Sequence, residues 1–159
     1  MKEELITRLI KSDQQLGKTS WYYHKLPKQL MVTNNQVVYL IPSNKSLLNE
    51  KELIKAEELE RLIPKGRGNL ITLANPIGTY IVTVEEEDVQ CTLFLGRNFK
   101  VIAVKSEDLK YFEKPTLRLN PDRPELLLVY ESVDKQDKLV GFVRTIDLVE
   151  SQVKSASQR

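Results

Sequence analysis

Apolar side chains recur at helical spacing near the start of the chain. The apolar positions are Leu5, Ile6, Leu9 and Ile10. On a helix they share one side, while charged side chains occupy the other. Gly17 follows, and glycine commonly ends helices because it adopts left-handed backbone angles. The pattern predicts an amphipathic helix that ends at Gly17.

A second helix is expected between Asn49 and Pro64. Asn49 takes the position of an N-cap, and Glu52 follows three residues later, as in a capping box. The apolar stripe consists of Leu53, Ala56, Leu59, Leu62 and Ile63. Proline cannot continue a helix, so Pro64 ends it. The stripe predicts that one face of this helix is buried.

Most other segments have the residue pattern of β-strands. Residues 30–32 and 37–41 flank Asn34-Asn35, a pair that tolerates left-handed backbone angles, and predict a hairpin. Further strands are expected at 70–73, 79–84, 89–95 and 99–104, with 117–119 as a brief edge strand and 125–133 and 139–148 as a last hairpin. The short, turn-rich gaps between 69 and 104 predict an antiparallel meander. Ser106 is expected to cap a short helix.

These elements predict an α+β fold. A mainly antiparallel sheet, made of the meander and the N- and C-terminal hairpins, is expected to pack against two longer helices and one short helix. The 159 residues, of which 41% are apolar, suit a single domain over 1–150. The candidate internal joint is 64–69. Residues 151–159 are expected to form a polar, flexible tail.

Composition excludes several classes of protein. No apolar run is long enough to span a membrane, and the first residues lack a secretory pattern, so a soluble, cytoplasmic protein with no membrane association is expected. One Cys forms no internal disulfide, and one Cys with one His cannot build a usual zinc site. A net charge of +2 is too small for nucleic-acid binding by bulk electrostatics.

No strong catalytic signature is present. The chain lacks the glycine-rich nucleotide motifs, the zinc-protease motif and the nucleophile elbow. Cys91 lies in an alternating strand and is interpreted as a buried small hydrophobe, and His24 as a packed or surface histidine. The acidic residues of the last quarter are Asp122, Glu131, Asp134, Asp137 and Asp147. They are interpreted mainly as solvated, so no metal, no cofactor and no enzyme are expected.

Basic and aromatic side chains provide the leading candidate surface for a partner. They are Lys18, Trp21, Tyr23, Lys25, Lys28, Lys65 and Arg67. Flat rings beside cations stack on nucleic-acid bases and also anchor protein interfaces. In a strand, Trp21 and Tyr23 share one face and Tyr22 takes the other, so at least one face is expected to be core. The loop with Lys65 and Arg67 also carries two glycines, whose free amides suit a phosphate.

An acidic block separates two of the predicted strands. It consists of Glu85, Glu86, Glu87 and Asp88. The simplest interpretation is a solvated turn, and the alternative is a contact with a cationic partner or an imitation of phosphates.

Four segments near the end of the chain resemble the closing helix and strands of a DNA polymerase sliding-clamp domain. They are residues 107–112, 116–119, 123–129 and 139–144. The first helix and the hairpin after it are also similar to the way such domains begin. The resemblance implies a clamp-like α+β module associated with DNA-processing machinery, which works by contact and not by catalysis.

Three functional hypotheses follow. The first is a non-catalytic interaction module on or within DNA-processing machinery, an accessory protein of a phage, plasmid or bacterium with a protein partner and with nucleic-acid contact left open. Lys outnumbers Arg, which suits an AT-rich genome of that kind. The second is a small inhibitor that occludes a partner enzyme such as a nuclease. The third is an enzyme without a recognisable motif.

Overall fold

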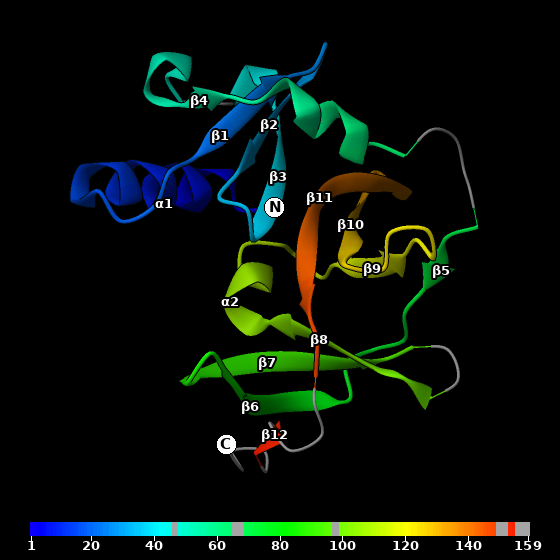
Figure 1. Cartoon of the computed structure of the whole chain (residues 1–159). Helices are drawn as coiled ribbons and strands as arrows, with labels where there is room; N and C mark the ends of the chain where they lie inside the picture. The colour runs from blue at the N-terminus through cyan, green and yellow to red at the C-terminus, as the bar shows by residue number, and fades with distance from the viewer. Residues whose placement is uncertain (46–47, 65–68, 97–98, 149–152, 155–159) are drawn as a thin grey trace.

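The fold is dominated by β-strands (Figure 1). A computed structural model describes residues 1–45, 48–64, 69–96, 99–148 and 153–154. The strands are β1 (Tyr22–Lys25), β2 (Gln29–Thr33), β3 (Val37–Pro42), β4 (Ile54–Lys55), β5 (Ile71–Thr72), β6 (Gly78–Val84), β7 (Glu87–Leu95), β8 (Val101–Lys105), β9 (Thr116–Leu119), β10 (Leu126–Val133), β11 (Gln136–Ile146) and β12 (Val153–Lys154). The helices are α1 (Glu3–Leu16) and α2 (Ser106–Leu109), with 3-10 helices η1 (Ser43–Lys45), η2 (Glu50–Glu52) and η3 (Glu57–Leu62).

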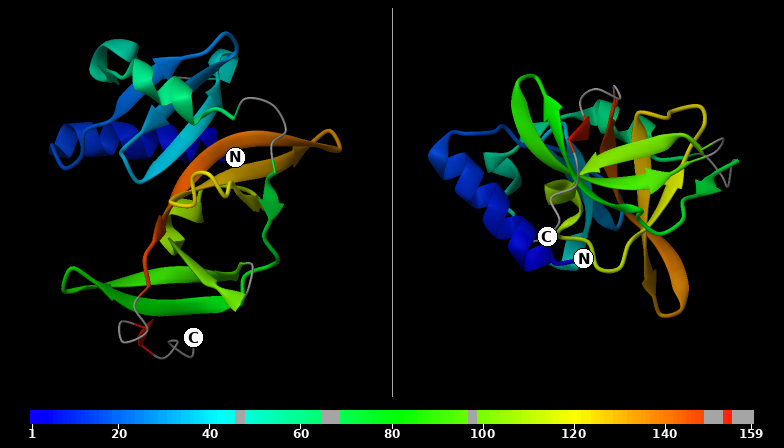
Figure 2. Two further views of the ribbon diagram at one scale, coloured as in Figure 1. Left: turned by 45° about the vertical axis from the view of Figure 1, so that its right-hand side comes forward. Right: turned by 90° about the horizontal axis from the view of Figure 1, so that it is seen from below.

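The twelve strands of the described residues belong to one connected sheet, and β11 joins its two halves. In the upper half the order is β4-β1-β2-β3-β11-β10-β9-β5, and in the lower half it is β11-β8-β7-β6-β12. β11 pairs with β3 through residues 141–143 and then with β8 through Thr145 and Ile146. The pairs are antiparallel except for β1 with β4, so the sheet is mixed. Figure 2 shows the two halves at an angle to each other, linked by β11.

Apolar side chains form three clusters. The main core lies between α1, the upper sheet and the inner face of the lower half; Ile10, Tyr39, Val129 and Val104 belong to it. The back cluster, which includes Leu128 and Phe142, lies on the other face of the upper sheet and is covered by Leu59 and Leu62 of η3. The lower cluster is small and contains Val82, Cys91, Leu93 and Ala103. The upper sheet is therefore covered on both faces.

The first predicted helix is confirmed as α1. Its stripe packs into the main core, where Ile6 and Ile10 are fully buried. Gly17 has a φ of 63° and its N–H bonds back to the carbonyl of Gln14, which ends the helix as predicted.

The second predicted helix is wrong. Asn49 does cap, since its side chain accepts a hydrogen bond from the Lys51 N–H, but the helix that follows is η2, of only three residues. The chain then forms β4. The N–H of Ile54 in β4 donates to the Trp21 carbonyl, and the N–H of Ala56, just after β4, donates to the Tyr23 carbonyl. Pairing with β1 satisfies the backbone and leaves only the 3-10 helix η3 before Pro64.

The expected fold class is corrected accordingly. Of the helices in the described segments, only α1 exceeds six residues, so the sheet does not pack against two longer helices. The apolar stripe between Leu53 and Ile63 is nevertheless buried in part, since Leu53 and Ala56 are covered and Leu59 packs on the back cluster. The predicted buried face is thus confirmed in part, and pairing with the neighbouring strand β1 sets the backbone conformation of this segment.

The hairpin predictions hold better. Asn34 and Asn35 turn between β2 and β3, with Asn35 at a φ of 73°, and β6, β7 and β8 form the expected meander. β5 does not join that meander and pairs instead with β9, so β9 lies between β10 and β5 and is not an edge strand. Ser106 begins α2 without capping it, and its hydroxyl instead bonds Thr92 at 2.8 Å.

Gly141 marks the crossing of β11 over the main core. The β10–β11 register shifts there, with Gly141 opposite Val129 and Leu139 opposite Tyr130. A Cβ atom at Gly141 would collide with the carbonyl oxygen of Val38 and would lie 2.8 Å from the Phe112 ring. The close approach of β3 and Phe112 to β11 therefore requires glycine at this position.

Candidate functional site

A groove of about 770 Å³ lies between the two halves of the sheet. Its walls come from β7 and β8 below, from the β9–β10 connection above, and from the end of β11. The apolar lining residues are Leu93, Val101, Ile102, Leu119, Pro124, Ile146 and Leu148, and the charged ones are Lys100, Glu125 and Asp147. Size and lining are those of a site that takes a ligand or a peptide segment.

Among the residues that the structure describes, β8 has one edge without a partner strand beside this groove. β8 pairs with β7 along its full length, from Lys105 to Val101, but it pairs with β11 only at Val104 and Ala103. Within the described residues no strand pairs with the β11 side of β8 at Val101 and Ile102. Ile102 belongs to the main core and Leu93 to the lower cluster, so the groove reaches both faces of the lower sheet.

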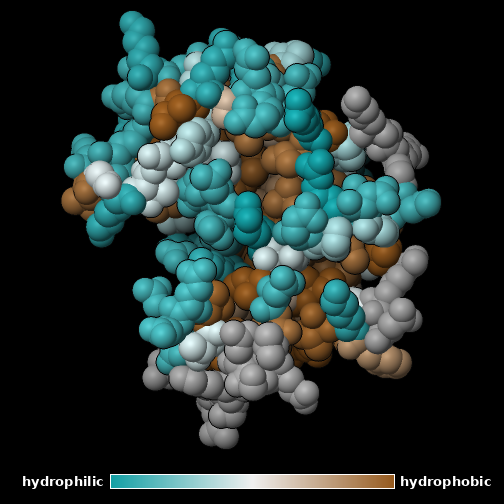
Figure 3. Space-filling view, viewed as in Figure 1, coloured by the Kyte–Doolittle hydropathy of each residue, from teal (hydrophilic) through white to brown (hydrophobic). Residues whose placement is uncertain are grey.

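Exposed apolar side chains continue outward from the groove. They are Ile77, Leu95, Phe99 and Val101, and Phe99 is 86% exposed. They lie at the start of β6 and around the β7–β8 connection, and apolar atoms are visible over this part of the lower half (Figure 3). Contiguous exposed apolar surface marks interaction sites in proteins.

A second, smaller cavity of about 240 Å³ lies on the back of the upper half. It is lined by Arg61 of η3, by Asn120, Asp122 and Arg123 of the β9–β10 connection, and by apolar side chains that include Leu128 and Phe142. The two cavities share no lining residue.

Only some residues of the predicted basic and aromatic surface are exposed. Trp21 is 1% exposed; its Nε1–H donates to Asp13 Oδ2 at 2.9 Å and its ring stacks on Tyr39 at 6.3 Å. Tyr23 packs against the same main core, which confirms the predicted shared face and identifies it as the core face. Trp21 therefore presents no exposed ring to a partner.

The described cations of that surface are exposed. Lys25 is exposed and pairs with Glu50 at 3.4 Å, and Lys18 and Lys28 are exposed. Lys65 and Arg67 lie outside the described residues, so the predicted phosphate loop has no structural description.

The acidic block forms the tip of the β6–β7 hairpin. Glu85 and Glu86 make the turn, with φ values of 49° and 69°, and Glu87 and Asp88 begin β7. All four side chains are exposed, and Thr83 Oγ1 donates to Asp88 Oδ1 at 3.0 Å. The hairpin belongs to the lower half, while Lys25 and Lys28 belong to the upper half (Figures 1 and 2). The two predicted surfaces do not form one site.

Cys91 and His24 lie in different parts of the fold. Cys91 is fully buried in the lower cluster, as predicted, and burial raises the pKa of its thiol above the ordinary value, which disfavours the reactive thiolate. His24 lies in β1, and its Nε2 is 3.8 Å from Glu60 Oε2. No group of three or more His, Cys, Asp or Glu residues in the described ranges has the arrangement of a metal site.

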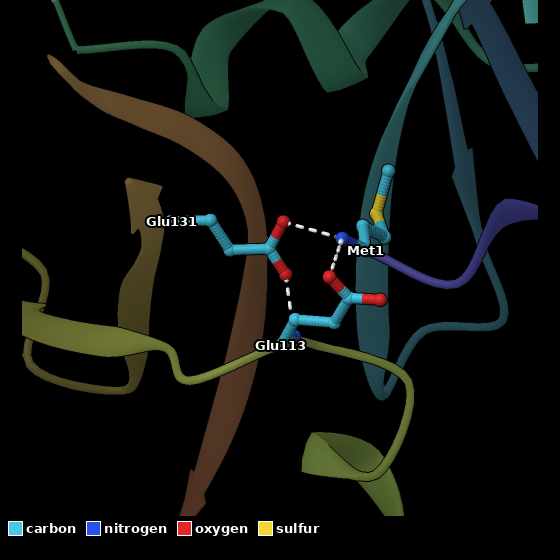
Figure 4. Close-up of polar contacts among 3 residues, drawn as sticks. All are labelled: Met1, Glu113 and Glu131. Atoms are coloured by element: carbon cyan, nitrogen blue, oxygen red, sulfur yellow. Dashed lines mark hydrogen bonds and ion pairs between the residues drawn. The ribbon is translucent and has the colours of Figure 1, made fainter. Parts of the chain in front are cut away.

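Two buried carboxylates were not foreseen as buried. Glu131 is 6% exposed and accepts hydrogen bonds at 2.6 Å from the Met1 α-amino group and from the Glu113 N–H (Figure 4). Asp108 is 9% exposed, and burial raises its pKa to about 6, with Glu107 adding to the rise and Lys105 opposing it. The alternation of side chains along a strand could have predicted the burial of Glu131, because Glu131 lies on the same strand face as the core residues Leu127 and Val129.

The sequence pattern also does not predict the groove. Residues 100–102 have an ordinary strand pattern, and the groove exists because β11 leaves β8 after Ile146. A weaker signal was present, since Ile77 and Phe99 are large apolar residues next to predicted turns, where polar residues are usual. Large apolar residues in turns indicate a covered or partner-binding surface.

No helix in the described part of the chain has the length and apolar character needed to cross a membrane. Comparisons of the chain with protein-family models, with curated proteins and with solved structures found no match.

Proposed function

We propose that this protein is a non-catalytic interaction module that holds an extended segment of a partner protein in the groove. The observation that carries the proposal is the open edge of β8 inside that groove. Backbone N–H and C=O groups at a sheet edge pair readily with another chain. A peptide that adds a strand gains main-chain hydrogen bonds from the edge and specificity from side-chain pockets beside it.

The lining defines the chemistry of the partner segment. Apolar walls suit alternate apolar side chains of an extended peptide. The charged lining residues are Lys100, Glu125 and Asp147, so the two carboxylates favour a basic residue in the partner segment. The three residues 100–102 span about 10 Å of strand, enough for a short pairing.

The resemblance of residues 107–112, 116–119, 123–129 and 139–144 to a sliding-clamp domain supplies the context of the proposal. In that context the partner segment belongs to a component of DNA-processing machinery, and the protein is an accessory factor of a phage, plasmid or bacterium. Catalysis has no part in this proposal.

Two exposed valines provide a matched test. Val101 lines the groove and is 38% exposed, while Val133 is 44% exposed at the far end of β10. A random peptide library is selected on the purified protein, and binding of the recovered peptides is measured by fluorescence polarisation. We expect Val101→Glu to weaken binding at least tenfold and Val133→Glu to leave it unchanged, because only the first places a charge in the apolar groove.

Hydrogen exchange then tests the mode of binding. Strand addition should slow amide exchange at Val101 when the peptide is bound, because its N–H points away from β7. Equal peptide affinity of both valine variants would refute the groove as the site, and an unprotected Val101 amide would refute strand addition.

The inhibitor hypothesis remains the second candidate. The observation in its favour is the exposure of all four side chains of the Glu85–Asp88 block at a hairpin tip. Carboxylates displayed in this way can meet a cationic surface on an enzyme such as a nuclease. Partner affinity should fall after Glu86→Lys with Glu87→Lys; a complex that survives this double reversal would exclude the acidic block as its contact.

A further inference from the structure

The smaller cavity combines cations with an apolar floor. Arg61 comes from the last turn of η3, and Arg123 comes from the connection between β9 and β10. Leu128 and Phe142, which belong to the back cluster, line the same cavity. Two arginines from separate elements thus line one small cavity whose walls are part apolar and part polar.

Two of the three acidic side chains of η3, those of Glu57 and Glu60, lie near basic side chains outside the cavity lining. Glu57 pairs with Lys55 at 3.4 Å, and Glu60 lies 3.8 Å from His24. Asp122 is the one acidic residue that lines the cavity among the residues the structure describes. No carboxylate of the described chain lies within ion-pair distance of Arg61 or Arg123. With two arginines and one aspartate, the lining carries a net positive charge.

The segment that carries Arg123 is held in place by its own hydrogen bonds. Asn120 Oδ1 accepts from the Asp122 N–H at 3.0 Å, and the Asn120 carbonyl accepts from the Arg123 N–H at 2.9 Å. Leu126 N–H then bonds the Arg123 carbonyl at 3.3 Å. This local network orders the backbone at Arg123 before any ligand binds, which lowers the entropic cost of binding.

The geometry points to a binding site for a small organic phosphate, a phosphate ester carried on a flat apolar ring system. A single guanidinium fork satisfies a carboxylate, whereas a phosphate has three terminal oxygens and can bridge two forks from different directions. The apolar floor would cover the ring. The cavity volume equals the share of roughly eight water molecules, enough for one ring and one phosphate.

This site is independent of the proposed function, because no residue lines both the cavity and the groove. Failure of the peptide experiment therefore leaves the phosphate site untouched, and failure of the phosphate experiment leaves the groove untouched.

Phenyl phosphate is the first probe, with inorganic phosphate and benzoate beside it, and binding is measured by NMR titration at low salt. We expect phenyl phosphate to bind at least tenfold more tightly than either of the others, since only it has both the ring and the phosphate. Arg61→Gln and Arg123→Gln should each weaken it at least tenfold. Arg8→Gln, an exposed arginine of α1 that does not line the cavity, is the matched control and should change nothing.

A second arm distinguishes a free phosphate ester from a nucleic-acid end. Thymidine monophosphate is compared with a thymidine oligonucleotide that carries or lacks a 5′ phosphate. Binding that requires the 5′ phosphate supports the site and identifies a nucleic-acid end as the source, and binding of the mononucleotide alone supports it with a free nucleotide.

Three results would overturn the inference: no binding of phenyl phosphate at millimolar concentration, equal binding of benzoate, or binding that both arginine variants retain while their amide spectra stay native.

Discussion

The two halves of the sheet differ in how much of each face is covered by packed apolar side chains. The upper half has the main core on one face and the back cluster under η3 on the other, and its long strand β10 is further held by Glu131, Met1 and Glu113. The lower half shares the main core on its inner face, but its outer cluster is small. Its open β8 edge and exposed apolar residues, Phe99 above all, border the groove.

This difference links stability to function. Apolar burial on both faces of a sheet adds to the free energy of unfolding. A sheet with an open edge and exposed apolar side chains has less of this stabilisation, but it leaves backbone groups and apolar surface available to a partner. The upper half is the scaffold, and the lower half supplies the surface that we propose for a partner.

The largest effect is expected at the junction between the halves. Gly141→Ala places a methyl group against the Val38 carbonyl and the Phe112 ring, so β11 must move away from β3. We expect a loss of about 3 kcal/mol in unfolding free energy, measured by urea denaturation. Gly17→Ala is the control: it meets no atom within 4 Å and carries only the strain of a φ of +63°, so it should cost about 1 kcal/mol. Equal losses at both glycines would contradict the crowding at Gly141.

A pH effect is expected next, at Asp108. Burial raises its folded-state pKa to about 6 from an ordinary value of 3.8, so between these values the folded protein holds a proton that the unfolded chain has released. Stability that is present below the lower value is therefore lost as pH rises through about 6, by about 2 to 3 kcal/mol in total.

Asp108→Asn removes that titration while keeping the shape of the neutral carboxyl group. The variant should match the wild type near pH 4 and exceed it at pH 7 in unfolding free energy, measured by urea titration at each pH. Glu4→Gln, an exposed change on α1, controls for general charge effects. A parallel pH profile for wild type and Asp108→Asn would show that Asp108 titrates normally.

The smallest effect compares one hairpin turn in each half. Glu85-Glu86 and Asp134-Lys135 both occupy left-handed backbone angles without a glycine. Asn-Gly suits such turns, so each replacement should stabilise its hairpin by about 1 kcal/mol. Hydrogen exchange separates the halves: replacing Glu85-Glu86 should slow exchange in β6 and β7, and replacing Asp134-Lys135 in β10 and β11. Equal slowing throughout the chain would mean that the halves open only together.

Local patterns predicted much of the fold. The stripe of α1 with Gly17, the Asn34-Asn35 hairpin and the β6–β8 meander all depend on residues close in sequence, and they are confirmed. The segment from Asn49 to Pro64 failed because its cap and stripe suit a helix, while pairing of β4 with β1 provides other partners for the same backbone groups. Nothing within that segment shows that β1 will lie beside it.

Some features of the candidate sites also follow from local sequence, and others depend on distant parts of the chain. That Cys91 is buried and that Trp21 and Tyr23 share a face follow from strand alternation, and the exposure of the acidic block follows from its place at a turn. That Trp21 is enclosed by α1 and Tyr39 depends on distant elements, and so does the burial of Glu131 against the Met1 amino group.

The amino-acid sequence alone was enough to establish the first helix, most of the strands and the lack of recognisable catalytic motifs, because periodicity, turn chemistry and composition are local properties. The groove, the open edge of β8 and the shared cavity of Arg61 and Arg123 arise only when the chain folds, since each depends on segments far apart in the sequence. Long-range pairing is selected by the total burial of the folded chain, and no short segment contains that information.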